Sequence, residues 1–334
     1  MKAALLSVRA WVGRHPVAVT LVCTLAVTAA LVYGLWDKRE DFADAFGSAS
    51  LAILAAAAAL QIVWLLARSE AWHVCVGAAG GDVDRRRLYR ASAVGYLGNL
   101  FNSHVGMGVR IAALRRSSPE DSPNISTLIT AEMPIIVVEI ALAAICSFTL
   151  IGPLGLAWWA PVIFLGVAGA IFYAVTKLSH GKQHGFWAGL GVMRGLRSRW
   201  LIIGLVMFAT GGQVVRNWVV LQGLGVDVSA FDAMALLIGA AVVGLLPVGP
   251  TLGVTTAVLI LGSNGVAVTA AAGALLTATG AVGALVFAGW ALADGTWLRW
   301  RRGKGAPVEP EPELELAPIE GPVPEPLPEP HMSL

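Results

Sequence analysis

The sequence predicts an all-α fold, a polytopic bundle of transmembrane helices, and two observations lead to this prediction. Of the 334 residues, 57% are hydrophobic and 13% are charged, whereas a soluble domain carries about 25% charged residues. Several apolar stretches also reach the roughly 20 residues that a helix needs to cross a ~30 Å hydrocarbon core. Six of them are uninterrupted, at residues 17–36, 50–67, 126–151, 156–176, 200–222 and 266–293. Two more, 91–113 and 231–262, are broken by polar residues, glycine or proline.

The first span follows a basic N-terminus that contains Lys2, Arg9 and Arg14. The same order of charge and apolar residues occurs in signal peptides. However, the apolar run of about 20 residues exceeds the usual signal-peptide core of about 7–15 residues. We therefore expect an uncleaved first span.

The basic residues of the loops indicate the orientation of the spans, because Lys and Arg concentrate on the cytoplasmic side. The 37–49 loop is rich in acids, whereas the 68–90 loop contains five arginines. The 177–199 loop contains five basic residues and no acid, and four more basic residues follow the last span. We expect a multi-pass protein of the cytoplasmic membrane, with both termini in the cytoplasm.

The two interrupted segments must keep these loops on their predicted sides. A single crossing by 91–113 would place Arg115 and Arg116 outside, so this segment is expected to enter from the cytoplasm and return to it. Segment 231–262 must begin and end outside, either as a re-entrant pair or as two short spans broken at residues 246–250. Interrupted helices that approach from opposite faces are typical of inverted-repeat transporters, where irregular backbone lines a cavity. Two kinked helices in an ordinary bundle are the alternative.

The first interrupted segment holds a polar, glycine-rich run that leads to a charged residue. The candidate binding residues in this run are Asn99, Asn102, His104 and Arg110, with Gly106 between them. If the run lines a cavity open to the cytoplasm, Arg110 can hold a phosphate or carboxylate through two parallel hydrogen bonds. The alternative is an arginine that extends from the end of the segment to the interface.

Charged residues inside spans are costly and are therefore functional candidates. Glu132 and Glu139 lie seven residues apart in the third span, on one helix face and about 10 Å apart along the axis. Glu132 is near the inner end, where it can reach water, whereas Glu139 needs a proton or a partner. Arg216, the one basic residue deep in the fifth span, is that partner in the simplest hypothesis. Such an Arg216–Glu139 pair is either structural or part of a substrate site; alternatively, Arg216 reaches the outer headgroups.

We predict no chemical role for the other polar residues. Arg68 and Glu70 are expected to mark the inner end of the second span, and Trp72 belongs to an interfacial belt of aromatic residues. The three cysteines stand far apart, without the spacing of a zinc site or a disulfide framework. The sequence contains no nucleophile elbow, P-loop or HExxH motif. We expect no metal, no cofactor and no enzymatic activity.

The C-terminal residues have a different composition. Residues 305–334 contain nine of the 17 prolines, which alternate with glutamates, so they can form neither a helix nor a core. We expect a transmembrane domain at 1–300 and a disordered, Pro/Glu-rich cytoplasmic tail at 301–334. A solvated tail is the main interpretation, and a docking segment for a cytoplasmic partner is the alternative.

Three short motifs carry a resemblance to a known family. They are Arg68-Ser-Glu-Ala-Trp72, Gly98-Asn99-Leu100-Phe101 continuing through Gly106 to Arg110, and Leu246-Pro247-Val248-Gly249-Pro250-Thr251-Leu252-Gly253-Val254. Over most of residues 50–295 the chain resembles the lysylphosphatidylglycerol synthase transmembrane-region family, also described as flippase-like membrane proteins. The resemblance implies a domain that moves a lipid headgroup across the bilayer, through a cavity formed partly by re-entrant helices.

The resemblance also implies which residues form the site, and it has departures. Asn99, Gly106 and Arg110 match the first motif, and Pro247, Pro250 and Gly253 match the second. Where the family tends to have a proline and then an acid, this chain has Asn102 and Met107. Where the family tends to have a glutamate after the second glycine turn, this chain has Thr256. The chain thus lacks both acids of the family pattern, and this affects the substrate and the proton coupling that the resemblance implies. The aminoacyl-transfer domain of the synthases is not expected, because only the tail follows residue 300.

Together these observations predict a lipid transporter or flippase that moves an anionic or polyprenyl-linked lipid. Arg110 would contact the headgroup, and Glu139 and Arg216 would bracket the route. One alternative is a membrane enzyme acting on lipid-linked sugars, although the outer loops after the first offer only Asp227 and Asp232 as acids. Another is a non-catalytic accessory subunit. No nucleic-acid partner is expected.

Overall fold

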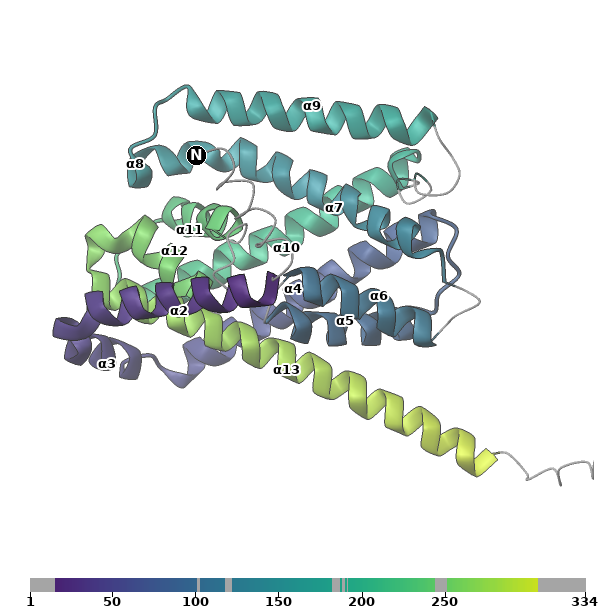
Figure 1. Cartoon of the computed structure of the whole chain (residues 1–334), viewed down its shortest axis with the longest axis horizontal. Coiled ribbons are helices and arrows are strands. Elements are labelled where there is room, and N and C mark those ends of the chain that lie inside the picture. Colours follow the sequence, from purple (N-terminus) through teal and green to yellow (C-terminus); the bar gives the residue numbers. More distant parts are fainter. Residues whose placement is uncertain are drawn as a thin grey trace, which may run out of the picture. The chain divides into compact units, whose positions relative to one another are not determined.

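The computed structural model describes residues 16–100, 103–117, 122–181, 187, 190, 192–243 and 251–305. Over these residues the chain is helical and contains no β-strand, which confirms the all-α prediction. The helices (Figure 1) are α2 (Pro16–Leu35), α3 (Arg39–Gly47), α4 (Leu51–Ala78), α5 (Arg85–Asn99), α6 (Ser103–Ser117), α7 (Ile125–Cys146), α8 (Ile151–Leu154), α9 (Ala160–Gly181), α10 (Leu196–Gly223), α11 (Ala230–Val243), α12 (Leu252–Leu261) and α13 (Val266–Gly305). Short 3-10 turns are η1 (Trp36–Lys38), η2 (Ser147–Leu150) and η5 (Gly262–Asn264).

Five helical stretches in the described residues are long and apolar enough to cross a membrane. They are 51–78, 125–154, 160–178, 196–223 and 266–296, and they coincide with the second to sixth predicted spans. The first predicted span corresponds to α2, a helix of 20 residues. Helix α9 leaves Val162, Phe164 and Val167 about half exposed, as expected for a helix that faces lipid. The chain is therefore a multi-pass membrane protein.

The chain divides into two units, residues 1–292 and 293–334. Helix α13 begins in the first unit and continues into the second. All contacts described below lie within the first unit. The predicted tail lies outside the described residues from position 306 onward.

Helix α4 is longer than the second predicted span. Its start is capped by Ser50, whose Oγ accepts a hydrogen bond from the backbone N–H of Ile53 (3.3 Å). It continues to Ala78 because no glycine or proline interrupts residues 51–76. Most of the predicted 68–90 loop is therefore helical, and Arg68 lies inside a helix rather than at its end.

The end of α4 is tied to the start of α5 by a small polar cluster. The carboxylate of Glu70 accepts a hydrogen bond from Arg85 Nε (2.8 Å) and another from the Tyr89 hydroxyl (2.6 Å). Burial, followed by the hydrogen bond to Glu70, raises the pKa of Tyr89 to about 12. These contacts hold the turn between the two helices.

The first interrupted segment forms a helical hairpin, as predicted. Helices α5 and α6 lie side by side (Figure 1), and glycines allow their backbones to approach. A Cβ atom added to Gly95 would lie 2.6 Å from Arg110 Cβ, and one added to Gly98 would lie 2.8 Å from the Cα of Gly106. Gly106 therefore acts as a close-packing position. Each helix has 15 residues, or about 22 Å of length.

The second interrupted segment is also broken into two helices that pack together, α11 and α12. With 14 and 10 residues they are about 21 and 15 Å long, shorter than a ~30 Å hydrocarbon core. Their lengths favour the re-entrant pair over two short spans. Gly253 in α12 contacts Gly273 in α13, where an added Cβ on Gly273 would lie 2.6 Å from the Cα of Val254.

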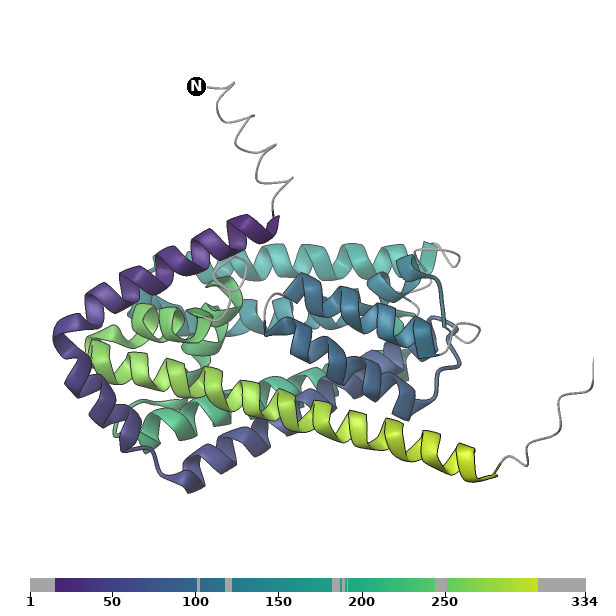
Figure 2. The same cartoon turned by 60° about the horizontal axis from the view of Figure 1, so that its bottom comes forward.

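The order of elements repeats along the chain. A long helix, a broken pair and a long helix occur as α4, α5–α6 and α7, and again as α10, α11–α12 and α13. The long helices α4 and α10 pack against each other. Figure 2 shows the blue hairpin α5–α6 and the green hairpin α11–α12 approaching each other from opposite ends of the bundle.

Candidate functional site

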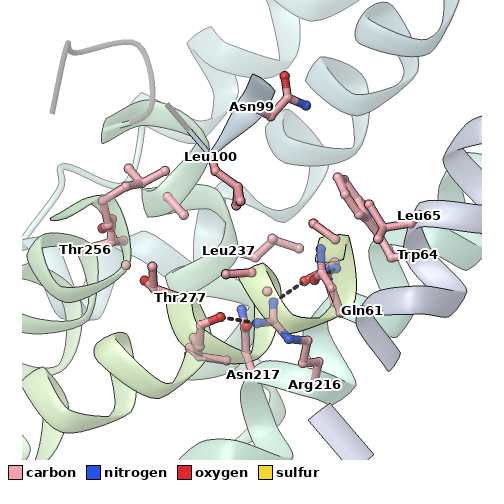
Figure 3. A pocket seen from close by; sticks show the side chains of 18 of the residues that line it. Gln61, Trp64, Leu65, Asn99, Leu100, Arg216, Asn217, Leu237, Thr256 and Thr277 are labelled. Atoms are coloured by element: carbon pink, nitrogen blue, oxygen red, sulfur yellow. Dashed lines mark hydrogen bonds between the residues drawn. The ribbon is translucent and has the colours of Figure 1, made fainter. Parts of the chain in front are cut away.

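A cavity of about 370 Å³ is lined by described residues of both hairpins and of three long helices. Hairpin α5–α6 contributes Asn99 to its wall and hairpin α11–α12 contributes Gly253, while Leu100 lines it just beyond the end of α5. The remaining lining residues come from the long helices α4, α10 and α13 and from the same hairpins. They are Gln61, Trp64, Leu65, Tyr96, Gln213, Arg216, Asn217, Leu236, Leu237, Ala240, Leu252, Thr256, Leu276, Thr277, Gly280, Ala281 and Ala284. Figure 3 shows Arg216, Asn217 and Gln61 at one end of this cavity and Asn99 with Leu100 at the other.

Arg216 is the charged residue in the described lining of this cavity. Its side chain is buried, with the residue 6% exposed. Nη1 donates a hydrogen bond to Gln213 Oε1 (3.0 Å), and Nη2 donates to Thr279 Oγ1 (2.9 Å) and to the carbonyl oxygen of Leu276. Nε is buried without a hydrogen-bond partner. All of these acceptors are neutral, so no carboxylate among the described residues compensates the charge of Arg216.

The amide side chains around Arg216 are arranged in a chain of hydrogen bonds. Gln213 Nε2 donates to Gln61 Oε1 (2.9 Å), which leaves the Gln61 amide nitrogen as a donor. Asn217 Nδ2 donates a long hydrogen bond to the carbonyl of Ala233 (3.4 Å). Together with Asn99, these residues supply both donors and acceptors to the cavity.

Gly280 lies directly beside Arg216. A Cβ atom added there would lie 3.4 Å from Arg216 Nη2. A methyl group at this position would therefore be in van der Waals contact with the guanidinium.

A separate ion cluster consists of the buried Arg110 and Glu132 and the partly exposed Arg68 and Glu139. Arg68 Nη2 lies 3.1 Å from Glu132 Oε1, Arg68 Nη1 contacts Glu139 Oε1, and Arg110 Nη2 contacts Glu132 Oε2. The Arg110 guanidinium also lies over the ring of Trp72, 4.1 Å from its centroid. With two arginines and two glutamates, the cluster is electrically balanced.

This cluster corrects several sequence-based expectations. The predicted Arg216–Glu139 pair is wrong, because Glu139 contacts Arg68 and Arg216 is bound by neutral groups of α10 and α13. Glu132 does not reach water; it is 4% exposed. The seven-residue spacing did place both glutamates on one face, but the partner is supplied by α4, whose helix continues past the predicted span end.

Arg110 and Trp72 also differ from expectation. Arg110 does not line the cavity in the described structure, because its guanidinium is held by Glu132 and Trp72. Trp72 is fully buried, at 0% exposure, and is not an interfacial residue. Its ring supports the Arg110 guanidinium inside the protein.

The remaining predicted residues are distributed as follows. Asn99 and Gly253 line the cavity, and Gly106 packs against the end of α5. His104 lies in the first turn of α6, and its side chain is outside the described part of the chain. Asn102, Pro247 and Pro250 lie outside the described residues.

Several cavity residues were missed by the sequence analysis. Gln61 and Gln213 each sit in the middle of an apolar span, and a glutamine in that position is a signal that can be recognised. Asn217 and Thr277 carry weaker signals, because single polar residues of this size are common in membrane helices. None of the described residues forms a group of His, Cys, Asp and Glu that could hold a metal ion.

No protein-family model matches the chain, and no curated protein matches it. The resemblance to the flippase-like family therefore remains a prediction from short motifs.

Proposed function

We propose that the protein is a lipid transporter of the cytoplasmic membrane that moves an anionic lipid headgroup through the cavity between the two hairpins. The observation that carries this proposal is Arg216, a buried cation in that cavity whose partners are all neutral. An isolated charge inside a membrane protein is costly. An anionic ligand would offset that cost, because charges attract strongly where the dielectric constant is low.

The depth of the cavity supports the same proposal. Gln61 is ten residues from the first residue of α4, Leu51, and Thr277 is eleven residues from the first residue of α13, Val266. At 1.5 Å per residue these positions lie about 15 Å along their helices, half of a ~30 Å core. Substrate sites near the membrane midplane, formed by broken helices, are typical of secondary transporters.

The size and lining of the cavity fit a headgroup rather than a whole lipid. Its volume of about 370 Å³ is near the lower end of the range for small-molecule sites. Leucines line the wall beside the polar groups. A headgroup can occupy the polar part while the acyl chains stay in the bilayer. The described lining contains no Asp or Glu, so it supplies no carboxylate base for the alternative of an enzyme acting on lipid-linked sugars.

The ion cluster has a supporting role in this proposal. It ties α6 to α4 and α7 through Arg110, Arg68 and Glu132. Because the cluster is electrically neutral and its Arg110–Glu132 pair is buried, it holds the first hairpin at a defined position. The basic loops predict which side each hairpin approaches from, with both termini in the cytoplasm.

The proposal can be tested with the purified full-length chain in liposomes. Fluorescent phosphatidylglycerol labelled on its acyl chain is incorporated into both leaflets of the liposomes. The fraction that a membrane-impermeant quencher can reach from outside is then followed over time. We expect Arg216→Gln to slow translocation roughly 10- to 100-fold, because hydrogen bonds to charged groups contribute about 1.5–3 kcal/mol. The matched control is Arg197→Gln, which removes an exposed arginine from the same helix outside the cavity.

The outcome separates the alternatives. Loss of translocation in Arg216→Gln with wild-type rates in Arg197→Gln supports transport through the cavity. Equal rates in Arg216→Gln and the wild type would show that Arg216 does not contact the transported lipid. No translocation of any lipid by folded wild-type protein would leave the accessory-subunit interpretation.

A further inference from the structure

We infer that the cavity selects lipids whose headgroup is a phosphodiester bearing hydroxyl groups, such as a glycerol or sugar headgroup, and rejects headgroups that carry an ammonium group. This inference rests on the proposed function and names the class of lipid that it would move. It is carried by the balance of charged and neutral polar groups in the cavity wall.

The charge balance of the cavity is the first part of the argument. Arg216 contributes one positive charge, and the described lining contains no carboxylate. A phosphodiester carries one negative charge, which matches the one positive charge of the guanidinium, and its oxygens accept charge-assisted hydrogen bonds. An ammonium group brought into the same space would meet Arg216 and have no carboxylate to pair with. Like charges that meet in a site of low dielectric constant repel strongly.

The neutral polar groups are the second part. The amides of Gln61, Gln213, Asn217 and Asn99 each combine donors with an acceptor. A hydroxyl group also donates and accepts, so a polyol headgroup can satisfy both kinds of group at once. The primary ammonium of ethanolamine only donates, and the trimethylammonium of choline neither donates nor accepts, so both leave the amide donors of the wall unsatisfied. Unsatisfied buried donors reduce affinity.

The orientation of the two glutamines is determined by Arg216. Gln213 Oε1 accepts from Arg216 Nη1 (3.0 Å), so its Nε2 donates to Gln61 Oε1 (2.9 Å). Because Gln61 Oε1 is the acceptor at the end of these hydrogen bonds, the Gln61 Nε2 group remains as a donor. Gln213 separates it from Arg216 in the series of hydrogen bonds. The phosphate and the hydroxyls of one headgroup are therefore expected to bind at separate, neighbouring positions.

The arginines of the ion cluster cannot take the place of Arg216 in this selection. Arg110 and Arg68 both contact Glu132, and Arg68 also contacts Glu139. Their charges are balanced inside the ion cluster. Arg216 is thus the cation of the described cavity wall that an anionic headgroup can reach.

The test is a binding series with the full-length protein in detergent micelles. Short-chain lipids with identical tails and different headgroups are compared: phosphatidylglycerol, phosphatidylinositol, phosphatidylethanolamine and phosphatidylcholine. Binding is followed by tryptophan fluorescence, because Trp64 lines the cavity, and is checked by native mass spectrometry. We expect the glycerol and inositol lipids to bind at least about tenfold more tightly than the two amine lipids, a difference of about 1.4 kcal/mol.

A substitution in Gln213 distinguishes ligand binding from helix bracing. Gln213→Glu keeps the acceptor for Arg216 Nη1 and adds a negative charge at hydrogen-bond distance from it. Helix bracing by Arg216 is retained, but its charge is neutralised, so the tenfold preference should disappear. The matched control is Gln222→Glu, which adds the same charge to an exposed position of α10 outside the cavity and should keep the preference.

Each outcome has a separate meaning. Equal binding of the amine and hydroxyl lipids by the wild type would overturn the headgroup inference while leaving lipid transport intact. Preference for phosphatidylglycerol over its methylated, hydroxyl-free phosphodiester analogue supports the hydroxyl part, and equal binding of these two refutes it. Binding of no lipid at all, together with no translocation, would refute the proposed function itself. The wild-type series gives these answers even if a variant fails to fold.

Discussion

The ion cluster makes a quantitative prediction about Glu132. This carboxylate contacts both Arg68 and Arg110, and its side chain is 6% exposed while that of Arg110 is 8% exposed. Glu132→Gln keeps the shape of the side chain but leaves the cluster with one excess positive charge. Removing one partner of a buried ion pair costs about 3–5 kcal/mol, because the remaining charge is left uncompensated. We expect the free energy of unfolding to fall by that amount.

The structure also predicts how the loss is distributed within the cluster. Arg68 retains Glu139, whereas Arg110 loses the carboxylate that it contacts. Glu139→Gln should therefore cost less, about 1 kcal/mol, because Arg68 keeps Glu132 and the Glu139 side chain is 36% exposed. In the double variant Glu132→Gln/Arg110→Gln the cluster is neutral again, so more than half of the lost stability should return.

The assay is reversible unfolding of the purified protein in mixed micelles, with sodium dodecyl sulfate as denaturant and far-ultraviolet circular dichroism as readout. The wild type, both single variants and the double variant are measured in the same micelles. A cost below about 1 kcal/mol for Glu132→Gln, or a double variant less stable than the single one, would refute the assignment of a buried, charge-balanced cluster.

Two further predictions concern packing and pH. Gly273→Val should destabilise the protein by about 1–3 kcal/mol and slow translocation, because an added Cβ would meet the backbone of Val254 at 2.6 Å. The control in the same helix is Gly289→Ala, because an added Cβ there would meet nothing within 4 Å. Equal thermal stability of the two variants would contradict the packing. Tyr89 has its pKa raised from 10.0 to about 12, so its contribution to stability is complete below about pH 10 and is lost as the pH rises toward 12. Tyr89→Phe should flatten the stability of the protein over that pH range, and an unchanged pH profile would show that the hydroxyl is not buried as described.

The backbone breaks were predictable because they depend on residues that are close in sequence. Asn99 to Gly106 and the glycine–proline run after Val243 interrupt otherwise apolar segments, and both segments are broken in the structure. Loop charge then required the first segment to double back, and α5 and α6 pack as a hairpin. Asn99 was recognised from the same local signals, and Gly253 from the motif that carries the family resemblance.

The partners of the buried charges were not predictable in the same way. Spacing within one helix shows that Glu132 and Glu139 share a face, but it does not show which helix packs against that face. Helix α4 supplies Arg68 because it continues to Ala78, and the hairpin folds back far enough to bring Arg110 to Glu132. Arg216 donates hydrogen bonds to Gln213 in its own helix and to Thr279 and the Leu276 carbonyl in α13. All of these partners are neutral.

The sequence by itself therefore determined the fold class, the spans, the broken segments and most of the charged residues inside the bundle, although Arg68 was expected at a span end. These follow from apolarity, helix breakers and the cost of charge in a membrane, which are properties of a residue and its near neighbours. Only the tertiary structure decided that four of the charges neutralise one another and that Arg216 is left in the cavity with glutamines. The reason is that an ion pair needs two side chains within about 4 Å, and that distance is set by which helices pack together.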